Sequence, residues 1–244
     1  MNSEMQDRIK CLNPKRWFIL PKWDELPDQL KTEAVRPYYD ALSRHKAGLF
    51  FKRMLDVFAA LFLIILLGIP MLVIALMIKC DSKGPVFFRQ ERVTAYGAKF
   101  RIHKFRTMVN NAERLGTSVT VENDNRITRV GSKLRDHRLD EFPQLFDVLA
   151  GNMSFVGTRP EVVKYVDRYT DEMNATLLMP AGITSIASIE YKDEAELLEA
   201  AENADEVYVN EILPAKMAYN LKSVREFSFF KDIGVLFKTV AAVL

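Results

Sequence analysis

The sequence predicts a mixed α/β protein that is mostly helical, carries one small β-hairpin or sheet, and attaches to a membrane. Three observations support this fold class. Residues 57–78 contain no charged side chain, a β-rich run around a glycine follows them, and apolar residues recur at helical spacing through much of the remaining chain. We therefore divide the 244 residues into an N-terminal extension at 1–48, a re-entrant membrane helix-break-helix at 49–80 and a third region at 81–244.

The composition argues against several classes of protein. The chain holds 34 basic and 32 acidic residues, and because a nucleic-acid-binding protein usually has a clear basic excess, no nucleic-acid partner is expected. Its two cysteines, Cys11 and Cys80, lie far apart and match no common metal-ligand spacing, which predicts free thiols in a reducing compartment. With three scattered histidines, zinc chemistry is not expected. No apolar run precedes Leu49, so we expect no secretory signal.

The N-terminal extension is polar and is interrupted by prolines, which limit its helices to short pieces. These prolines are Pro14, Pro21, Pro27 and Pro37. An aromatic cluster of Trp17, Phe18 and Trp23 lies among basic residues. Two interpretations stay open: the cluster anchors at a membrane interface, or the extension is a small soluble segment packed on the main domain.

The uncharged segment is long enough to enter a membrane. Its 22 residues would extend about 33 Å as a helix, and the hydrocarbon core of a bilayer is about 30 Å thick. Gly68 and Pro70 interrupt it, so we place a break in the membrane helix at Ile69-Pro70. At its entry, Lys52 and Asp56 stand four residues apart, where they can pair.

The charges on both flanks favour a helix that enters the membrane and returns to the same side. The basic residues are Arg44, Lys46, Lys52 and Arg53 before the segment, and Lys79, Lys83, Arg89 and Arg92 after it. Because positive residues prefer the cytoplasmic side, both flanks are expected there. A kinked spanning helix is the alternative, since prolines are tolerated in transmembrane helices.

A β-hairpin is predicted between residues 84 and 108, where two β-rich runs flank Tyr96-Gly97. The two-residue period of a strand places Gln90 and Arg92 on one side, and likewise Lys104 and Arg106. These side chains either line one edge of a site or form a solvated face of the hairpin.

An acidic pair, Asp140-Glu141, stands just before Pro143 and an apolar run at helical spacing. The preceding residues 109–131 are interpreted as a helix start and a loop. A helix N-terminus stabilises carboxylates and also attracts phosphate, so the pair, with Arg135 and Arg138 nearby, is either a helix cap or a phosphate-handling site.

Two later features complete the pattern. After a predicted short strand near residue 154, Arg159-Pro160 forms a stiff elbow whose guanidinium suits phosphate oxygens. From Val162 onward the chain is predicted to be mostly helical. A final apolar stripe predicts either an interfacial amphipathic helix or a packed core helix; its residues are Phe227, Phe230, Ile233, Phe237 and Val240.

Taken in order, these stretches resemble the bacterial sugar transferase family, the monotopic phosphoglycosyl transferases. The resemblance covers roughly residues 50 to 190 and rests on Lys52-Arg53 with Asp56, Gly84-Pro-Val-Phe-Phe-Arg-Gln with Arg92, Lys104-Phe-Arg-Thr-Met, Leu139-Asp-Glu-Phe-Pro-Gln-Leu, Gly151-Asn-Met-Ser-Phe-Val-Gly with Arg159-Pro-Glu, and Pro180-Ala-Gly-Ile-Thr. The chain departs from the family pattern at Thr94, Thr158 and Arg138, and Ile69-Pro70 replaces a frequent Ser-Pro.

The resemblance implies an enzyme that transfers a sugar-1-phosphate from a UDP-sugar to polyprenyl (undecaprenyl) phosphate, releases UMP and begins glycoconjugate synthesis, for capsule, exopolysaccharide, O-antigen or glycoprotein. It implies a catalytic domain at 81–244 on the cytoplasmic face of the bacterial inner membrane. Asp140 would be the nucleophile, and Mg²⁺ would bind Glu141 and Asp140. Lys104, Arg135 and Arg159 would hold phosphate oxygens. The substrate-binding set implied is Gln90, Arg92, Arg106, Arg159, Pro160 and Glu161.

Several questions stay open at this point. A rival interpretation is a non-catalytic membrane-anchored scaffold whose basic clusters hold anionic lipid headgroups. A closer one is a hexose-1-phosphate transferase of the same family. The sequence is compatible with a homodimer but does not settle the oligomeric state, the sugar, the pathway or the role of residues 1–48.

Overall fold

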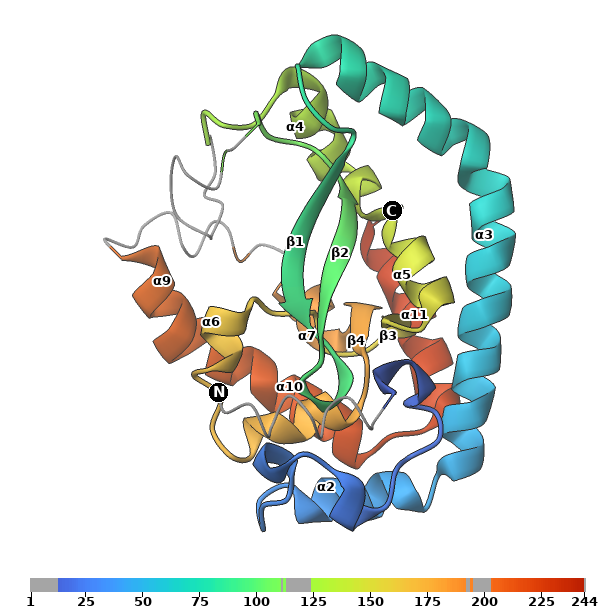
Figure 1. Cartoon of the computed structure of the whole chain (residues 1–244), viewed down its shortest axis with the longest axis vertical. Coiled ribbons are helices and arrows are strands. Elements are labelled where there is room, and N and C mark those ends of the chain that lie inside the picture. Colours follow the sequence, from blue (N-terminus) through green and yellow to red (C-terminus); the bar gives the residue numbers. More distant parts are fainter. Residues whose placement is uncertain (1–12, 111, 113–123, 192–193, 195–202, 244) are drawn as a thin grey trace.

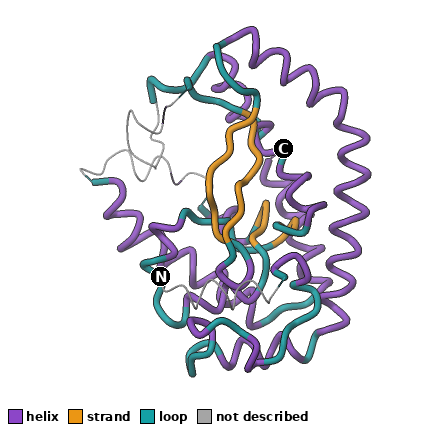
Figure 2. The backbone as a smooth tube through the Cα atoms, viewed as in Figure 1, coloured by secondary structure: helices purple, strands orange, loops and turns teal. Residues whose placement is uncertain are grey.

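The computed structural model describes residues 13–110, 112, 124–191, 194 and 203–243. In this part of the chain the protein is mostly helical, with two small two-stranded sheets, as Figure 2 shows. The predicted class, mostly helical with a small sheet, is confirmed at this level. One long helix, α3 (Lys46–Asp81), curves around one side of a body made of the other elements (Figure 1).

The N-terminal segment consists of short pieces, as its prolines predict. It contains 3-10 turns at Pro14–Arg16, Trp23–Glu25 and Asp28–Leu30, followed by helix α2 (Arg36–Ser43). Trp17 is fully buried in the largest core cluster, where the segment meets Tyr96 of the hairpin turn and Leu178. The segment is therefore packed on the main body. Residues 1–12 lie outside the described residues.

Helix α3 is the one helix in the described residues that is long and apolar enough to cross a membrane. The helix continues through Pro70 without interruption. The break expected at Ile69-Pro70 is therefore absent from α3, and the helix curves along its length instead (Figure 1). Most of its apolar side chains are exposed, Ile69 to 78%. Its inner face packs on three core clusters, through Leu49, Ala60 and Ile78.

The start of α3 is fixed to the body by its basic residues. Lys52 is 3% exposed, and its Nζ donates to Asp232 Oδ2 at 2.5 Å and to the carbonyl of Val156 at 2.8 Å. The pairing expected with Asp56 gives way to this contact, because Asp232 lies on the C-terminal helix α11 (Phe229–Val243) that packs beside α3. The Asp56 carboxylate instead accepts from the backbone N–H of Phe155.

The predicted hairpin is confirmed. Strands β1 (Phe87–Val93) and β2 (Lys99–Phe105) pair antiparallel, with Gln90 opposite Ile102 and Phe88 opposite Lys104. The turn between them uses positive φ at Tyr96 (59°) and Gly97 (74°). Because opposite residues share a face of the sheet, Gln90, Arg92 and Lys104 lie on the same face of the hairpin.

A second sheet was only half predicted. Strand β3 (Met153–Val156) pairs parallel with β4 (Ala181–Thr184), which falls within the region predicted to be mostly helical. Gly157 and Gly182 let the two chains approach closely, since a Cβ on Gly182 would lie 2.1 Å from the nitrogen of Gly157. The parallel pair thereby holds the stretch that leads to Arg159 beside the end of β4.

The remaining described elements are helical and surround the sheets (Figure 1). They are α4 (Arg129–Asp136), α5 (Gln144–Ala150), α6 (Val163–Val166), a 3-10 helix at Met173–Leu178, α7 (Ile186–Glu190), α9 (Ala204–Val207), a π-helical turn at Tyr208–Ile212, and α10 (Leu213–Arg225). Of the predicted loop before α4, residues 111 and 113–123 lie outside the described residues.

Candidate active site

The acidic pair lies in a short turn directly ahead of helix α5. Leu139–Glu141 forms a 3-10 turn, preceded by Arg138 in the left-handed region at φ 52°. Pro143 caps the N-terminus of α5, a position that suits its fixed φ and missing N–H. The predicted helix start is thus confirmed. Neither carboxylate caps it through a side-chain hydrogen bond to the described backbone, which removes the main support for a purely capping role.

Glu141 is held by two cations. Its Oε1 accepts from Lys104 Nζ at 2.8 Å and from an Arg159 guanidinium nitrogen at 2.7 Å. Burial alone would raise the pKa of Glu141, but the charges and hydrogen bonds of Arg159 and Lys104 outweigh burial and hold this pKa well below its usual range. Glu141 therefore joins the hairpin, through β2, to the loop after β3.

Asp140 differs from its neighbour in its hydrogen bonds. Among the described residues none donates a hydrogen bond to its carboxylate, which lines a cavity of about 700 Å³. Burial raises the pKa of the Asp140 carboxyl, and the negative charge of Glu141 raises it further. The positive charges of Lys104, Arg135 and Arg159 act in the opposite direction, but the pKa stays above its usual value. An unpaired carboxylate beside cations, in a cavity, is free to react with or bind an incoming group.

This cavity brings together most of the sequence-predicted site residues. Those that line it are Gln90, Arg92, Lys104, Arg106, Arg135 and Asp140. Arg135 comes from α4, and its guanidinium makes no hydrogen bond or salt bridge to the described residues. Arg89, Arg101 and Arg126 also line the cavity, so its wall is strongly cationic. Such a wall suits an anionic ligand such as a diphosphate.

Two of the predicted substrate-binding arginines are already engaged by protein groups. Arg92 donates to the carbonyl of Pro160 at 3.1 Å and to Gln90 Oε1 at 2.5 Å. Arg106, which is 5% exposed, donates to the carbonyls of Ser82 (2.7 Å) and Lys83 (3.0 Å) just after α3. Arg106 thus ties the end of the long helix to the cavity wall, and its contact with substrate stays a prediction.

Four predicted site residues do not line this cavity: Glu141, Arg159, Pro160 and Glu161. Pro160 and Glu161 are buried, and Glu161 Oε1 accepts from the hydroxyl of Tyr208 at 2.6 Å. Tyr208 opens the π-helical turn before α10, and Lys216 of α10 lies over its ring. Glu161 therefore anchors the Arg159 loop to the C-terminal helices.

Sequence reasoning missed two supporting pairs. Nothing in the spacing of Tyr208 pointed to Glu161. Asp147, fully buried in α5, accepts from both the backbone N–H and the ring Nδ1 of His103, at 2.8 and 2.9 Å. A lone charge among the apolar positions of α5 was the only signal in the sequence. This pair fixes β2, and with it Lys104, against the helix that follows the acidic pair.

The acidic residues of the site are the possible ligands for the magnesium that the family resemblance implies. The described residues contain no group of three or more His, Cys, Asp or Glu side chains that could hold a metal. Two adjacent carboxylates are nevertheless sufficient when the ligand supplies phosphate oxygens, because Mg²⁺ is usually bound by one or two carboxylates plus phosphates and water. Asp140 and Glu141 are the residues that would hold such a metal.

The described residues thus combine a helix long and apolar enough to enter a membrane with a cationic cavity that the Asp140 carboxylate lines. This combination is typical of membrane-associated proteins that act on anionic ligands. The chain belongs to the bacterial sugar transferase family, whose sequence profile matches residues 47–244.

Relatives support this assignment. One is the UDP-N-acetylgalactosamine-undecaprenyl-phosphate N-acetylgalactosaminephosphotransferase of Aeromonas hydrophila, 35% identical over 80% of this chain and 44% of the relative. Two others are UDP-glucose:undecaprenyl-phosphate glucose-1-phosphate transferases. The one from Klebsiella pneumoniae is 33% identical over 87% of this chain and 44% of its own length. The one from Caulobacter vibrioides is 34% identical over 79% of this chain and 69% of its own length. The chain thus spans less than half the length of the first two relatives.

Proposed function

We propose that the protein is a phosphoglycosyl transferase that moves a sugar-1-phosphate from a UDP-sugar to undecaprenyl phosphate, with UMP as the other product. The observation that carries this proposal is the contrast within the acidic pair. Glu141 is clamped by hydrogen bonds from two cations, whereas the Asp140 carboxylate accepts no hydrogen bond from the described residues and lines the cationic cavity. The names of the relatives, which specify UDP-sugars and undecaprenyl phosphate, support the substrate classes.

In the first step, an Asp140 carboxylate oxygen attacks the β-phosphorus of the UDP-sugar. A new bond joins this oxygen to phosphorus, and the bond from the β-phosphorus to the bridging oxygen breaks, so UMP leaves with that oxygen. In the second step, a phosphate oxygen of undecaprenyl phosphate attacks the same phosphorus. The bond to Asp140 breaks, and undecaprenyl-diphosphate-sugar and the free carboxylate result.

The cationic residues make this attack feasible, because two anions must approach each other. Lys104 and Arg135 face the cavity that Asp140 lines and would hold phosphate oxygens. Arg159 acts through Glu141, which it holds beside Asp140. Magnesium, bound by Glu141 and Asp140 together with the diphosphate, would supply further positive charge at the reacting phosphate.

The test follows phosphosugar transfer to the protein itself. Wild-type enzyme incubated with UDP-sugar and magnesium, without lipid, should gain the mass of one phosphosugar and release UMP. Asp140→Asn should do neither. Asp136→Asn, an exposed carboxylate four residues away on α4, is the matched control and should keep the adduct. An adduct on Asp140→Asn would refute the nucleophile assignment.

The same assay separates this function from the scaffold alternative. A scaffold that only binds anionic headgroups would release no UMP with any donor and would lose lipid binding gradually as single arginines or lysines are removed. A donor screen with UDP-N-acetylgalactosamine, UDP-glucose and UDP-galactose, followed by UMP release, would identify the sugar. Release from none of them would count against the proposed function.

We further propose that α3 enters the cytoplasmic membrane from the cytoplasmic face and returns to it. Both ends of α3 contact the same body: Lys52 bonds Asp232 of α11 near its start, and Asp81 Oδ2 accepts from the N–H of Val130 on α4 at its end, at 3.1 Å. A straight spanning helix would separate these contacts by a bilayer. Exposed positions at the two flanks allow a test.

Arg44→Cys and Lys83→Cys, each in a chain lacking its native cysteines, should be labelled by an impermeant thiol reagent from the cytoplasmic side only. Labelling of the two positions from opposite sides would show that α3 spans the membrane.

A further inference from the structure

The N-terminal segment 13–45 lies outside the family match at 47–244, yet its aromatic side chains join the exposed apolar face of α3. Phe18 contacts Phe50 edge-to-face, with ring centroids 6.5 Å apart, and Phe50 contacts Phe51 at 6.0 Å. Phe51 continues to Phe229 at 6.2 Å, and Phe229 contacts Phe230 at 5.5 Å. One continuous aromatic row, here called the aromatic belt, thus runs from the N-terminal segment across α3 to α11.

Much of the aromatic belt is exposed. Phe50, Phe51 and Phe230 are 49%, 56% and 78% exposed, and Ile19, next to Phe18, is 59% exposed. Trp17 points the other way and is fully buried in the core. The segment therefore divides its apolar residues between the protein interior and an outer surface that continues the apolar face of α3.

The charges next to two aromatic positions of the belt suit an anionic lipid surface. Exposed basic residues flank these positions in the sequence, with Lys15, Arg16 and Lys22 around Phe18 and with Arg44 and Lys46 before Phe50. The segment also exposes Asp24, Glu25, Asp28 and Glu33, so the basic character is local to these positions. Aromatic side chains concentrate at the headgroup level of a bilayer, and basic residues near the surface are attracted to anionic lipids. The aromatic belt begins where α3 begins and continues onto α11, so it extends the exposed apolar face of α3. We therefore assign the same lipid environment to both surfaces, and not a soluble protein partner to the belt alone.

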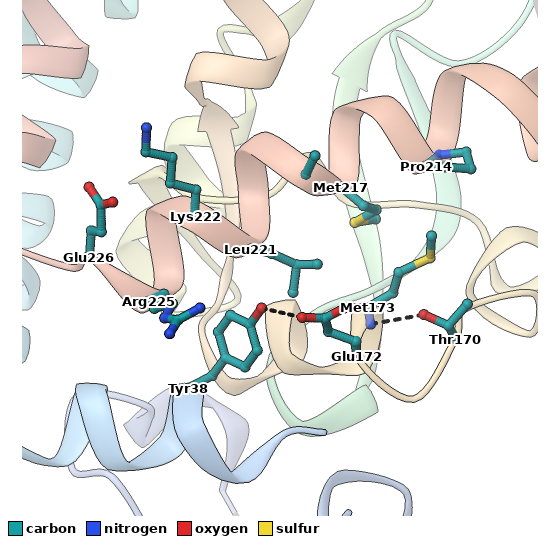
Figure 3. Close-up of a pocket in the computed structure, with 11 residues that line it drawn as sticks. Tyr38, Thr170, Glu172, Met173, Pro214, Met217, Leu221, Lys222, Arg225 and Glu226 are labelled. Carbon is teal, nitrogen blue, oxygen red and sulfur yellow. Dashed lines mark hydrogen bonds between the residues drawn. The ribbon is translucent and has the colours of Figure 1, made fainter. Parts of the chain in front are cut away.

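The segment is also held rigidly enough to present Ile19 at a fixed height. Figure 3 shows where α2 meets α10 and the loop before the 3-10 helix at Met173–Leu178: the hydroxyl of Tyr38 donates to Glu172 Oε1 at 2.6 Å. Tyr39 donates to the carbonyl of Pro21 at 2.9 Å, which ties α2 back to the earlier turns.

We infer that residues 13–45 form a second, interfacial membrane contact, in which Phe18 and Ile19 sit at the headgroup level of an anionic bilayer beside Phe50 and Phe230. The inference rests on the membrane placement of α3 in the proposed function. This contact would fix the height of the main body above the bilayer, and with it the height of the cavity that Asp140 lines.

The test measures depth in vesicles with the full-length chain. Single cysteines are placed in a Cys11→Ser, Cys80→Ser background, labelled with an environment-sensitive fluorophore, and quenched by lipids brominated at a shallow acyl position. Ile19→Cys should be quenched to the same extent as Phe50→Cys in phosphatidylglycerol-containing vesicles. Ala218→Cys, exposed on α10, is the control and should not be quenched.

The outcomes separate this inference from the proposed function. Quenching of Leu66→Cys, in the middle of α3, reports the membrane placement on its own. If position 66 is quenched and position 19 behaves like position 218, the N-terminal contact is refuted while the membrane helix stands. If position 66 is also unquenched, the membrane placement itself fails. The double substitution Lys15→Glu, Arg16→Glu should weaken the quenching at position 19. This result would support the attraction of the basic residues to anionic lipid.

Discussion

The clamp on Glu141 gives a prediction whose magnitude follows from the structure. Glu141→Gln keeps the size of the side chain but removes the charge that both Lys104 and Arg159 bond, at 2.8 and 2.7 Å. The side chains of Glu141 and Lys104 are 11% and 19% exposed, whereas Arg159 is 30% exposed. Breaking a buried ion pair costs about 3 to 5 kcal/mol, and the partial exposure of Arg159 places this case near about 3 kcal/mol.

The assay is thermal unfolding of the detergent-solubilised chain, followed by tryptophan fluorescence. Trp17 is buried in the core, and Trp23 packs against the same cluster. For a protein of this size about 3 kcal/mol corresponds to a fall of roughly 6 to 12 °C in melting temperature. Asp40→Asn breaks the exposed pair with Arg36 and is the matched control, with little change expected. A melting temperature for Glu141→Gln equal to that of the wild type would show that the clamp does not stabilise the site.

Three further predictions concern the contacts that position the site. Asp232→Asn should destabilise the protein by about 3 kcal/mol, because it removes the charge that bonds buried Lys52. The control is Glu226→Gln, which breaks the exposed pair with Lys231 and should change the melting temperature little. Equal effects of the two variants on the melting temperature would refute the reasoning. Gly131→Ala should prevent folding, since the added Cβ would lie 2.0 Å from the carbonyl oxygen of Thr107. Gly68→Ala is the control and should fold normally, because its Cβ would enter open space. A stably folded Gly131→Ala protein would contradict the described packing of α4. Tyr208→Phe removes the hydroxyl that donates to buried Glu161 and should lower the free energy of unfolding by about 1 to 3 kcal/mol. Tyr219→Phe, at an exposed position, is the control. An equal fall in the free energy of unfolding for both variants would count against the anchor.

The sequence by itself determined the local features of this protein. The hairpin at β1 and β2, the short N-terminal helices and the helix start at Pro143 depend on periodicity, on proline geometry and on turn residues such as Gly97, and these act over a few residues. The same local logic placed Asp140 and Glu141 next to a helix N-terminus. It also identified the long apolar helix, because an uncharged run of that length needs no tertiary context to be read.

Only the tertiary structure decided how these features work together. The sequence did not distinguish the two carboxylates by their contacts. Packing brings Lys104 of β2 and Arg159 of the loop after β3 to Glu141, and both bond it, whereas none of the described residues donates a hydrogen bond to the Asp140 carboxylate. The parallel partner of β3, the Lys52–Asp232 pair and the Tyr208–Glu161 anchor join residues 28, 180 and 47 positions apart. Such contacts depend on where whole elements lie in space, which neither residue spacing nor local propensity specifies.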